Sequence, residues 1–587
     1  MQNTDITKIR NSEHNFELID QAKSVKWAIA SRIKIYTDSL DTKIICLVYM
    51  SIKAASLNSN NPLHLDEALN AIKDRDIQCF ISENISRDIW DAVKDVCFGT
   101  PTEILEVIPF LPEEYSGRFG EYSTPKTIGT LAKHLLEINE GERVADFCCG
   151  KGNFLLDTYI DNPNNKYYGE ELNTNAIYIS KIKFDLLEGN TSKKVLLKHG
   201  NVFDGYDSDN TKYDKIFSNY PFAMRIKEHP SMIRFVQEHP EFKLTTSASA
   251  DWAFNALIKS KLSKDGKAVV IMPNGPLFKF GPDMEVRKLF IENGYIETII
   301  ALPKNVFDYT SIPSTMLVFG KNSKNKIRFV DASECYAKTR RVNVLSNENI
   351  NTILEATKKN TDISRFVDIK ELEKNDYNLT PQKYLTKAVE LKNAKEFGSI
   401  IKNITRGAGI TAVELDKISS ADETDYQYVM LANIKGGIID SKLPYITQIP
   451  EKYERYCIKN NNLLLSKNGA PYKVAVATVE DNKKILANGN LFVIEIDEDK
   501  ADPHYLKAFF NSQEGNKLLS SLSTNGTMPS ISVNDLKKAQ IPLPSLKKQK
   551  EIANKFLIVE DEIKVLEIKI NKCREKLIDI FNTEEDA

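Results

Sequence analysis

The chain has 587 residues, of which 42% are hydrophobic and 27% are charged, and this composition excludes wholesale disorder. At roughly 150 residues per domain, the length predicts three or four domains. The 79 Lys and Arg residues nearly balance the 81 Asp and Glu residues, which excludes a uniformly basic, histone-like protein. A local basic cleft is still compatible with this balance, because net charge averages over all domains.

The cysteines and the apolar stretches exclude several further classes of protein. The eight cysteines show no paired CxxC spacing, so no metal site and no disulfide framework are expected. The first residues lack an apolar signal core, and the most apolar early stretch, residues 44–50, is too short to span a bilayer. We therefore expect reduced thiols, a cytoplasmic location and no membrane partner.

Residues 1–115 are predicted to form an N-terminal helical domain. Apolar residues recur at a spacing of three and four through residues 31–55 and again through residues 81–96. A turn-forming cluster of Asn, Ser and Pro lies between them at residues 58–62. This pattern is typical of amphipathic helices joined by short loops.

Residues 116–390 are predicted to form an α/β domain. Short apolar runs alternate there with amphipathic helical stretches, and the runs are residues 144–147, 166–169, 195–198, 214–217, 268–272 and 296–301. Alternation of strand and helix indicates a mostly parallel, Rossmann-like sheet with helices on both faces.

Residues 391–545 are predicted to form a separate α/β domain, after a polar, lysine-rich stretch. Its expected strands are short and interrupted by Gly and Asn, and they cover residues 400–405, 426–431, 462–466, 473–479 and 491–496. The change from long alternating elements to short strands marks the domain boundary.

Residues 546–587 carry the most regular periodicity in the chain. Apolar residues alternate steps of four and three at Ile552, Phe556, Val559, Ile563, Leu566, Ile570, Cys573, Leu577 and Ile580. This seam predicts a coiled-coil helix. The alternative is a long amphipathic helix packed on its own domain.

A glycine-containing turn and a pair of carboxylates indicate a nucleoside site. Asp146 and the glycines Gly150 and Gly152 follow a predicted strand and precede a helix, and glycines at such a turn let the backbone approach a ligand. The next predicted strand ends about twenty residues later in Glu170 and Glu171, where doubly wound folds place the acid that binds ribose hydroxyls. No GxGxxG motif follows, so a nucleoside without a diphosphate fits better than NAD. Taken alone, the GxG turn is also compatible with an ordinary tight turn.

The segment Asn219-Tyr220-Pro221-Phe222 directly follows the strand at residues 214–217. An amide, a proline-restricted turn and an aromatic ring suit an extruded planar base, because the ring can stack on the base. The amide oxygen and the carbonyl of residue 220 can accept both protons of an exocyclic amine. A four-residue match is common by chance, but its order after the glycine turn and the acid-ended strand favours this interpretation.

Most of residues 1–390 resembles the gamma-class amino-methyltransferases, specifically the modification subunit of type I restriction–modification systems. The motifs are those above, residues 119–125, and the segments 266–278, 302–307 and 377–380. The resemblance implies S-adenosyl-L-methionine as cofactor, bound by Tyr122, Thr124, Pro125, Asp146, Gly150, Gly152, Asn153, Phe154, Glu171, Asn201 and Asn219. It also implies that the catalytic residues are Asn219, Tyr220, Pro221 and Phe222.

From residue 397 onward the chain resembles half of a type I specificity subunit, with one target recognition domain and one spacer helix. The match lies in residues 523–532, 541–544 and 549–552. It implies double-stranded DNA as a partner and a homodimer through the C-terminal helix. The sequence contains no Walker A loop and no evident nuclease cluster, so cleavage would require a restriction or nuclease subunit as a further partner.

Three residues depart from the family pattern. Tyr220 replaces the first proline of the usual Asn-Pro-Pro-aromatic motif, Lys151 stands where serine is common, and Asn201 stands where an aspartate usually faces the cofactor adenine. Residue 220 keeps its carbonyl but loses the fixed φ of proline. We expect Tyr220→Pro to preserve or raise activity.

The predicted function is sequence-specific methylation of the adenine N6 amine in DNA within a restriction–modification system. One alternative is a catalytically silent DNA-recognition scaffold, for which Tyr220 is the motivation. A second is cytosine N4 methylation, since the same four residues fit that amine. Protein-glutamine methyltransferases share those residues, but they do not explain the DNA-reader-like region.

Overall fold

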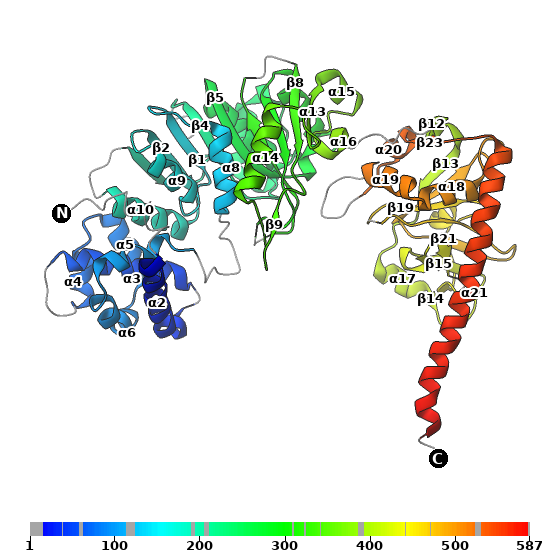
Figure 1. The fold of residues 1–587 in the computed structure, drawn as a ribbon, viewed down its shortest axis with the longest axis horizontal. Helices are drawn as coiled ribbons and strands as arrows, with labels where there is room; N and C mark the ends of the chain where they lie inside the picture. The colour runs from blue at the N-terminus through cyan, green and yellow to red at the C-terminus, as the bar shows by residue number, and fades with distance from the viewer. Residues whose placement is uncertain are drawn as a thin grey trace. The chain divides into compact units, whose positions relative to one another are not determined.

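The computed structural model describes residues 16–37, 39–57, 63–112, 124–188, 194–204, 210–307, 310–321, 325–340, 342–385, 393–440, 442–469, 471–522 and 530–584. The chain divides into two compact parts, unit 1 (Met1–Pro381) and unit 2 (Gln382–Ala587). Figure 1 shows the helices and strands of both. Within the described ranges, no helix has the length and apolar character needed to cross a membrane.

Unit 1 begins with a group of helices. They are α2 (Phe16–Ile33), α3 (Leu40–Ala55), α4 (Leu65–Asn70), α5 (Arg75–Asn84), α6 (Arg87–Phe98) and α7 (Thr102–Leu105), with 3₁₀ turns at Lys34–Tyr36 and Ile108–Phe110. The start of α6 is capped by Ser86, whose side chain accepts from the N–H of Ile89. The apolar pattern at residues 31–55 is thus split, because a 3₁₀ turn separates α2 from α3. Phe80 of α5 stacks on Tyr178 with ring centroids 4.6 Å apart, which joins this group to the rest of unit 1.

The centre of unit 1 is a nine-stranded sheet with the order β11-β8-β6-β7-β5-β4-β1-β2-β3. Its strands are β1 (Arg143–Phe147), β2 (Lys166–Glu171), β3 (Val195–His199), β4 (Tyr213–Ser218), β5 (Leu262–Pro273), β6 (Ile296–Ala301), β7 (Ser314–Phe319), β8 (Lys326–Asp331) and β11 (Ser364–Asp368). The six predicted strands are confirmed as β1 to β6. Strands β3, β2, β1, β4 and β5 run parallel to one another, while β7 is antiparallel to both β5 and β6. The expected mostly parallel α/β fold is therefore confirmed.

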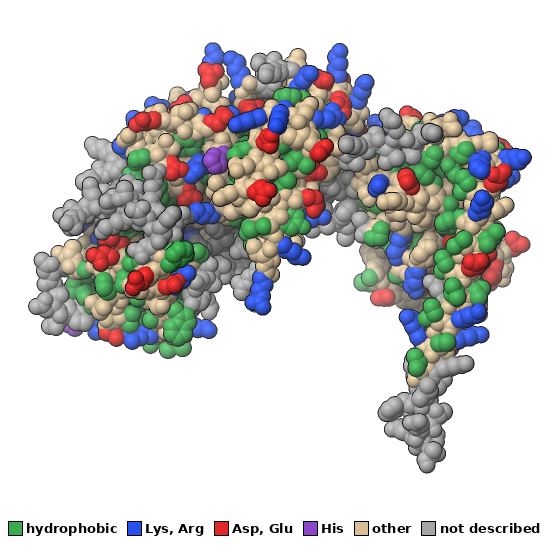
Figure 2. Space-filling view, viewed as in Figure 1, with side chains coloured by type: hydrophobic (Ala, Val, Ile, Leu, Met, Phe, Trp, Pro, Cys, Tyr) green, Lys and Arg blue, Asp and Glu red, His purple; other side chains and the backbone are tan. Residues whose placement is uncertain are grey.

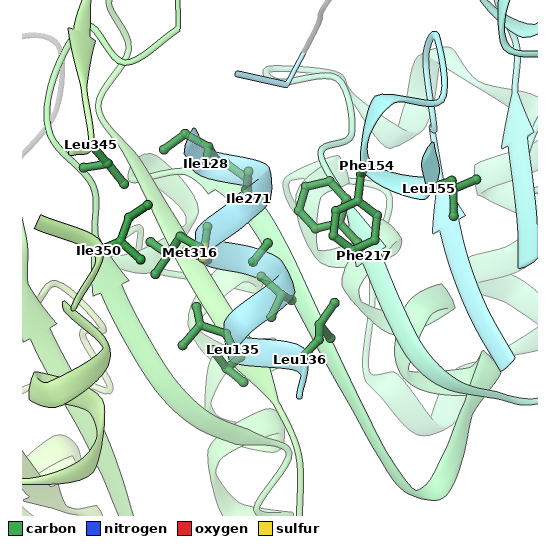
Figure 3. Packing of buried hydrophobic residues seen from close by; sticks show 14 of the residues in the cluster. Ile128, Leu135, Leu136, Phe154, Leu155, Phe217, Ile271, Met316, Leu345 and Ile350 are labelled. Atoms are coloured by element: carbon green, nitrogen blue, oxygen red, sulfur yellow. The ribbon is translucent and has the colours of Figure 1, made fainter. Parts of the chain in front are cut away.

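Helices cover both faces of this sheet. They are α8 (Lys126–Leu136), α9 (Asn153–Asp161), α10 (Thr174–Glu188), α11 (Pro230–Glu238), α12 (Ala250–Lys261), α13 (Pro282–Glu292), α14 (Asn347–Lys358) and α15 (Ile369–Lys374). On one face, Leu135 of α8 belongs to the same buried cluster as Met316 of β7, as Figure 3 shows. On the other face, Phe319 of β7 lies 5.8 Å from Phe290 of α13. Successive strand residues face opposite sides, so both sides of β7 are buried.

Unit 2 contains small sheets with the orders β13-β22-β19-β20, β14-β18-β15-β21, β12-β23 and β16-β17. The five predicted strands are confirmed as β13 (Ile401–Arg406), β15 (Tyr426–Val429), β19 (Leu463–Ser466), β20 (Val474–Val476) and β22 (Leu491–Ile496). The others are β12 (Ala394–Glu396), β14 (Ser419–Ser420), β16 (Ile434–Lys435), β17 (Ile438–Ile439), β18 (Tyr445–Ile446), β21 (Lys484–Ala487) and β23 (Gln540–Pro542). Its helices are α17 (Ala412–Ile418), α18 (Pro503–Asn511), α19 (Gln513–Leu522), α20 (Val533–Lys538) and α21 (Leu546–Glu584).

The long helix α21 has a packed part and an exposed part. In its first turns, Gln549 and Ala553 are buried, and Glu560 forms a buried ion pair with Lys507 of α18. Ile552 and Phe556 line a groove shared with α18. The first two positions of the predicted seam are therefore used within unit 2.

The remainder of the seam is exposed. Val559, Ile563, Leu566, Ile570 and Leu577 expose 46–69% of their surface, and Figure 2 shows hydrophobic side chains among basic ones on this part of α21. The side chain of Ile580 lies outside the described residues. An apolar seam that its own unit leaves uncovered keeps the coiled-coil interpretation open.

Candidate active site

A cavity of about 380 Å³ lies where the strand order of the central sheet reverses, next to β1 and β4. In doubly wound sheets, ligands bind at this place, outside the carboxyl ends of the strands. Its wall consists of Cys148, Gly150, Lys151, Glu171, Leu172, Asn173, Ala176, Asn201, Val202, Asn219, Pro221, Met224, His229, Met232 and Phe254. The loops after β1, β2, β3 and β4 thus all contribute to one cavity.

The turn after β1 has an unusual backbone. Cys148, Gly150 and Gly152 have positive φ values of 67°, 55° and 74°, a region that glycine adopts without a Cβ penalty. At Gly152 there is also no room for a side chain, since a Cβ atom would lie 2.1 Å from Oγ of Ser180 on α10. The second glycine is therefore required both by its conformation and by the close approach of α10.

Glu171, predicted to bind ribose, lines the cavity at the end of β2. Its Oε2 accepts from the N–H of Gly150 at 2.9 Å, and its Oε1 accepts from the N–H of Asn173 at 2.8 Å. Each carboxylate oxygen can accept more than one hydrogen bond, so ligand hydroxyls can still be bound. The role of Glu171 in holding the glycine turn was not expected from the sequence.

Asp146 lies beneath the same turn and is only 2% exposed. Its Oδ1 has no hydrogen-bond partner among the described residues. Burial, and then the nearby charge of Glu171, raise the pKa of Asp146 well above its ordinary value. A positively charged ligand group in the cavity would favour the ionised carboxylate, because an opposite charge offsets the cost of burial.

Asn219 follows β4 and also lines the cavity. Its Nδ2 donates to Oγ1 of Thr124 at 3.1 Å, across 95 residues of sequence. Pro125 is the N-cap residue of α8, and Tyr122 lies outside the described residues. The structure thus brings the predicted Thr-Pro segment next to the predicted amide.

The three residues after Asn219 are placed differently from one another. Pro221 lines the cavity, whereas Tyr220 is 1% exposed and is not part of the cavity wall. Phe222 is half-buried, lies outside the cavity wall, and meets Phe307 edge-on with ring centroids 6.4 Å apart.

The remaining predicted cofactor residues also separate into two groups. Asn201 lines the cavity, and its Oδ1 accepts from the N–H of Phe203 at 3.1 Å. Asn153 accepts from Nζ of Lys183 at 2.9 Å. Phe154 is buried and stacks on Phe217 at 4.3 Å in the core below the site, as Figure 3 shows. Neither Asn153 nor Phe154 belongs to the cavity wall.

Several cavity residues were not predicted from the sequence. Met224, His229, Met232 and Phe254 come from the segment after β4 and from α11 and α12, and Leu172 follows Glu171. The position of Leu172 next to the acid was a usable local signal. Met224 and His229 come from the segment between β4 and α11 and carry no motif, and Met232 and Phe254 reach the cavity through the packing of α11 and α12.

Within the ranges that the structure describes, no group of three His, Cys, Asp or Glu side chains is arranged to hold a metal ion. The cavity instead offers the carboxylate of Glu171, the amides of Asn173, Asn201 and Asn219, and an apolar wall. These groups suit an organic ligand that carries hydroxyls and positive charge.

Two family models match separate parts of the chain. Residues 107–393 match the family model described as N-6 DNA Methylase, and residues 415–573 match the model described as Type I restriction modification DNA specificity domain. The first range contains the whole cavity wall, and the second includes most of unit 2.

Individual relatives carry the same names. The chain is 30% identical over 316 residues to the "Type I restriction enzyme MjaVIII methylase subunit" of Methanocaldococcus jannaschii, a match that covers 49% of this chain and 53% of that one. The MjaVII methylase subunit of the same organism is 30% identical over 287 residues, covering 45% and 49%. The chain thus spans about half the length of these curated relatives.

Among solved structures, the type I methyltransferase subunit of Streptococcus thermophilus is 21% identical with a TM-score of 0.49, covering 62% of this chain and 98% of that one. The chain therefore joins a region similar to N-6 DNA methylases, residues 107–393, to a region similar to type I restriction–modification specificity domains, residues 415–573.

Proposed function

We propose that the protein transfers a methyl group from S-adenosyl-L-methionine to the N6 amine of adenine in DNA, at sites that unit 2 selects. The observation that carries this proposal is the single cavity that contains both Glu171 and Asn219. A carboxylate suited to ribose hydroxyls and an amide suited to a base amine therefore line the same cavity. Methyl transfer requires such an arrangement, because both reactants must be held in line.

The residues of the cavity fit this cofactor. A volume of about 380 Å³ lies within the range of roughly 300–1,000 Å³ that is usual for small-molecule sites. Glu171 would accept hydrogen bonds from the ribose hydroxyls, and Leu172, Met232 and Phe254 would contact the adenine ring. Asp146 is buried and lies outside the cavity wall, so its carboxylate would act on the positive charge of the cofactor from behind the glycine turn. When bound, the cofactor supplies a methyl group already activated by its sulfonium.

The protein's own contribution is to hold the base amine. The bond from Asn219 to Thr124 orients the amide, and its Oδ1 can accept from the amine because an amide oxygen has two lone pairs. The carbonyl of residue 220 would accept the second amine proton. Two such bonds favour a pyramidal nitrogen, which restores the nucleophilicity that conjugation with the ring removes.

Asn219→Ala tests this function. We expect methyl transfer to be abolished while cofactor affinity stays nearly unchanged, as measured by transfer of labelled methyl groups and by calorimetry. Asn165→Ala is the matched control, since Asn165 is a buried amide that directly precedes β2, at the end of the strand opposite to Glu171 and the cavity. It should lower the melting temperature without abolishing transfer. Wild-type transfer by Asn219→Ala would contradict the proposal.

The product distinguishes the alternatives. Digestion of the treated DNA to nucleosides should yield the N6-methylated adenine nucleoside, whereas the N4-methylated cytosine nucleoside would support the alternative of cytosine N4 methylation. Cofactor binding without any transfer would support the silent scaffold, for which the departure at Tyr220 is the motivation.

We propose in addition that α21 pairs with the same helix of a second chain. The exposed seam residues Val559, Ile563, Leu566 and Ile570 follow the alternating spacing of a coiled coil, and pairing would bury them. A two-fold dimer would carry two readers and would recognise a symmetric, interrupted DNA site.

Light scattering on Leu566→Lys tests the dimer. A charge in the seam should produce a monomer, because an unpaired lysine is costly in an apolar interface. Ile568→Lys is the matched control, since Ile568 is equally exposed but lies off the seam. A monomeric wild-type chain, or a target map with one asymmetric half-site, would rule the dimer out.

Three further assignments complete the proposal. The domains would be residues 1–115 (helical), 116–390 (methyltransferase), 391–545 (DNA recognition) and 546–587 (spacer helix). The protein would act in the cytoplasm, where its DNA substrate lies. The relatives are named as subunits of type I restriction enzymes, which supports a restriction subunit as the partner that cleaves.

A further inference from the structure

The side chain of Tyr220 lies behind the cavity wall. Its neighbours Asn219 and Pro221 both line the cavity, whereas Tyr220 is 1% exposed and does not. Its hydroxyl donates to Oδ1 of Asn255 on α12 at 3.0 Å. Asn255 is fully buried, and its Nδ2 lies 3.6 Å from Sδ of Met272 on β5. A short polar chain therefore ties the turn after β4 to α12 and β5.

The ring of Tyr220 makes a second connection. It stacks on Phe254 of α12 with centroids 4.6 Å apart and planes 7° apart. Phe254 itself lines the cavity and meets Phe203 edge-on at 4.9 Å. Phe203 directly follows Asn201 and Val202, which line the cavity from the loop after β3. The ring thus supports one cavity wall from behind.

The hydroxyl of Tyr220 is held in its neutral form. Burial raises the pKa of this phenol well above its ordinary value, and the nearby carboxylate of Asp251 raises it further. A neutral phenol is a hydrogen-bond donor, which suits the acceptor oxygen of Asn255.

We propose that Tyr220 is a positioning residue that couples the base site to the cofactor site. Its hydroxyl and ring hold the turn that carries Asn219 and Pro221, and its stack on Phe254 holds the apolar wall of the cofactor cavity. The side chain does by contact what a second proline would do by restricting φ. This inference rests on the proposed methyl transfer.

The structure therefore reverses the expectation for Tyr220→Pro. Proline would remove the ring behind Phe254 and the donor to Asn255, so both the turn and the wall would be free to shift. A displacement of about 1 Å at a reacting group can cost roughly 10²-fold in rate. We expect loss of activity rather than gain.

The experiment compares Tyr220→Pro, Tyr220→Phe and Tyr213→Leu in the full chain, with kcat, cofactor Kd and melting temperature measured for each. Tyr220→Pro should lower kcat at least about tenfold and weaken cofactor binding several-fold. Tyr220→Phe keeps the ring, so cofactor binding should persist while kcat falls by a smaller factor. Tyr213 is a buried tyrosine at the other end of β4, so Tyr213→Leu should lower the melting temperature alone.

Two results would overturn the proposal. One is a Tyr220→Pro variant that matches or exceeds the wild type in both kcat and cofactor Kd. The other is a Tyr220→Pro variant whose melting temperature falls, as in Tyr213→Leu, while its kcat and cofactor Kd stay unchanged. If Tyr220→Pro does not fold, the kcat of Tyr220→Phe decides. If the wild-type protein transfers no methyl group, the proposed function fails, and the cofactor Kd of Tyr220→Pro still decides the coupling.

Discussion

The turns after β1 and β4 lie at the ends of two paired strands, yet they are held in different ways. The β1 turn depends on positive φ values at Gly150 and Gly152 and on the carboxylate of Glu171, 21 residues after Gly150. The β4 turn depends on Thr124, 95 residues before Asn219, and on Asn255, 35 residues after Tyr220. The first turn combines glycine backbone preference with partners on the next strand and helix, whereas the second is held by elements that lie much further away in the chain, both before and after it.

Of the variants that test how the two turns are held, Gly152→Ala is expected to have the largest effect on stability and cofactor binding. The variant adds a Cβ atom at a φ of 74° and 2.1 Å from Oγ of Ser180. Left-handed backbone costs a non-glycine residue roughly 1–2 kcal/mol, and overpacking adds about 1–3 kcal/mol. We expect a clear fall in the melting temperature and loss of cofactor binding by calorimetry.

Gly141→Ala is the control that separates the cost of a positive φ from the cost of a close contact at the new Cβ atom. Gly141 has a φ of 86°, but a Cβ atom there would meet nothing within 4 Å. It should show the smaller loss of stability and normal cofactor binding. Equal effects of the two variants would mean that the approach of α10 does not constrain the β1 turn.

The next largest effect is expected from Glu171→Ala. It removes the acceptor for two backbone N–H groups and the group proposed to bind ribose. A hydrogen bond to a charged group is worth roughly 1.5–3 kcal/mol, so cofactor affinity should fall correspondingly in calorimetry. Glu171→Gln retains one acceptor oxygen and should lose less. Unchanged affinity in Glu171→Ala would reject the ribose assignment and the carboxylate's role in the turn together.

The smallest expected effect is a change of stability with pH, caused by a carboxyl group on the helix that supports the β4 turn. Asp251 lies at the start of α12, the helix that carries Phe254 and Asn255, and burial raises the pKa of its carboxyl to about 7. The folded protein therefore favours the protonated acid. This contribution to stability is complete below about pH 4 and is lost as the pH rises through 7.

Thermal unfolding between pH 5 and 8 measures this effect. We expect the wild-type melting temperature to fall by at least about 2 °C over that range, and Asp251→Asn to lose that part of the slope. The same slope in both proteins would show that Asp251 is already ionised when α12 is packed.

The fold was largely predictable because strands and helices have different hydrophobic periods. The runs that became β1 to β6 were identified on that basis, as were five strands of unit 2. The insertion of β7 between β5 and β6 was not predicted, since nothing in the sequence of residues 314–319 states which strands it will pair with. Pairing is a choice among partners that are distant in sequence.

The seam of α21 shows the same limit. The spacing from Ile552 to Ile580 was evident in the sequence, but it did not distinguish residues packed on unit 2 from residues left exposed. The structure divides the seam after Phe556, because Lys507 and the groove of α18 cover the first turns. Which residues a helix buries depends on the neighbouring surface as well as on its own period.

By itself, the sequence determined the elements, the glycine turn, the acid that follows it and the position of the segment Asn219–Phe222 after β4, because each depends on backbone preference or on short spacing. Only the tertiary structure decided that Thr124 meets Asn219, that Phe254 and Met232 form the apolar wall, and that the ring of Tyr220 lies behind it. These contacts join residues that are 30 or more positions apart in most cases. Their formation depends on close packing of side chains from several helices and strands, which no local pattern records.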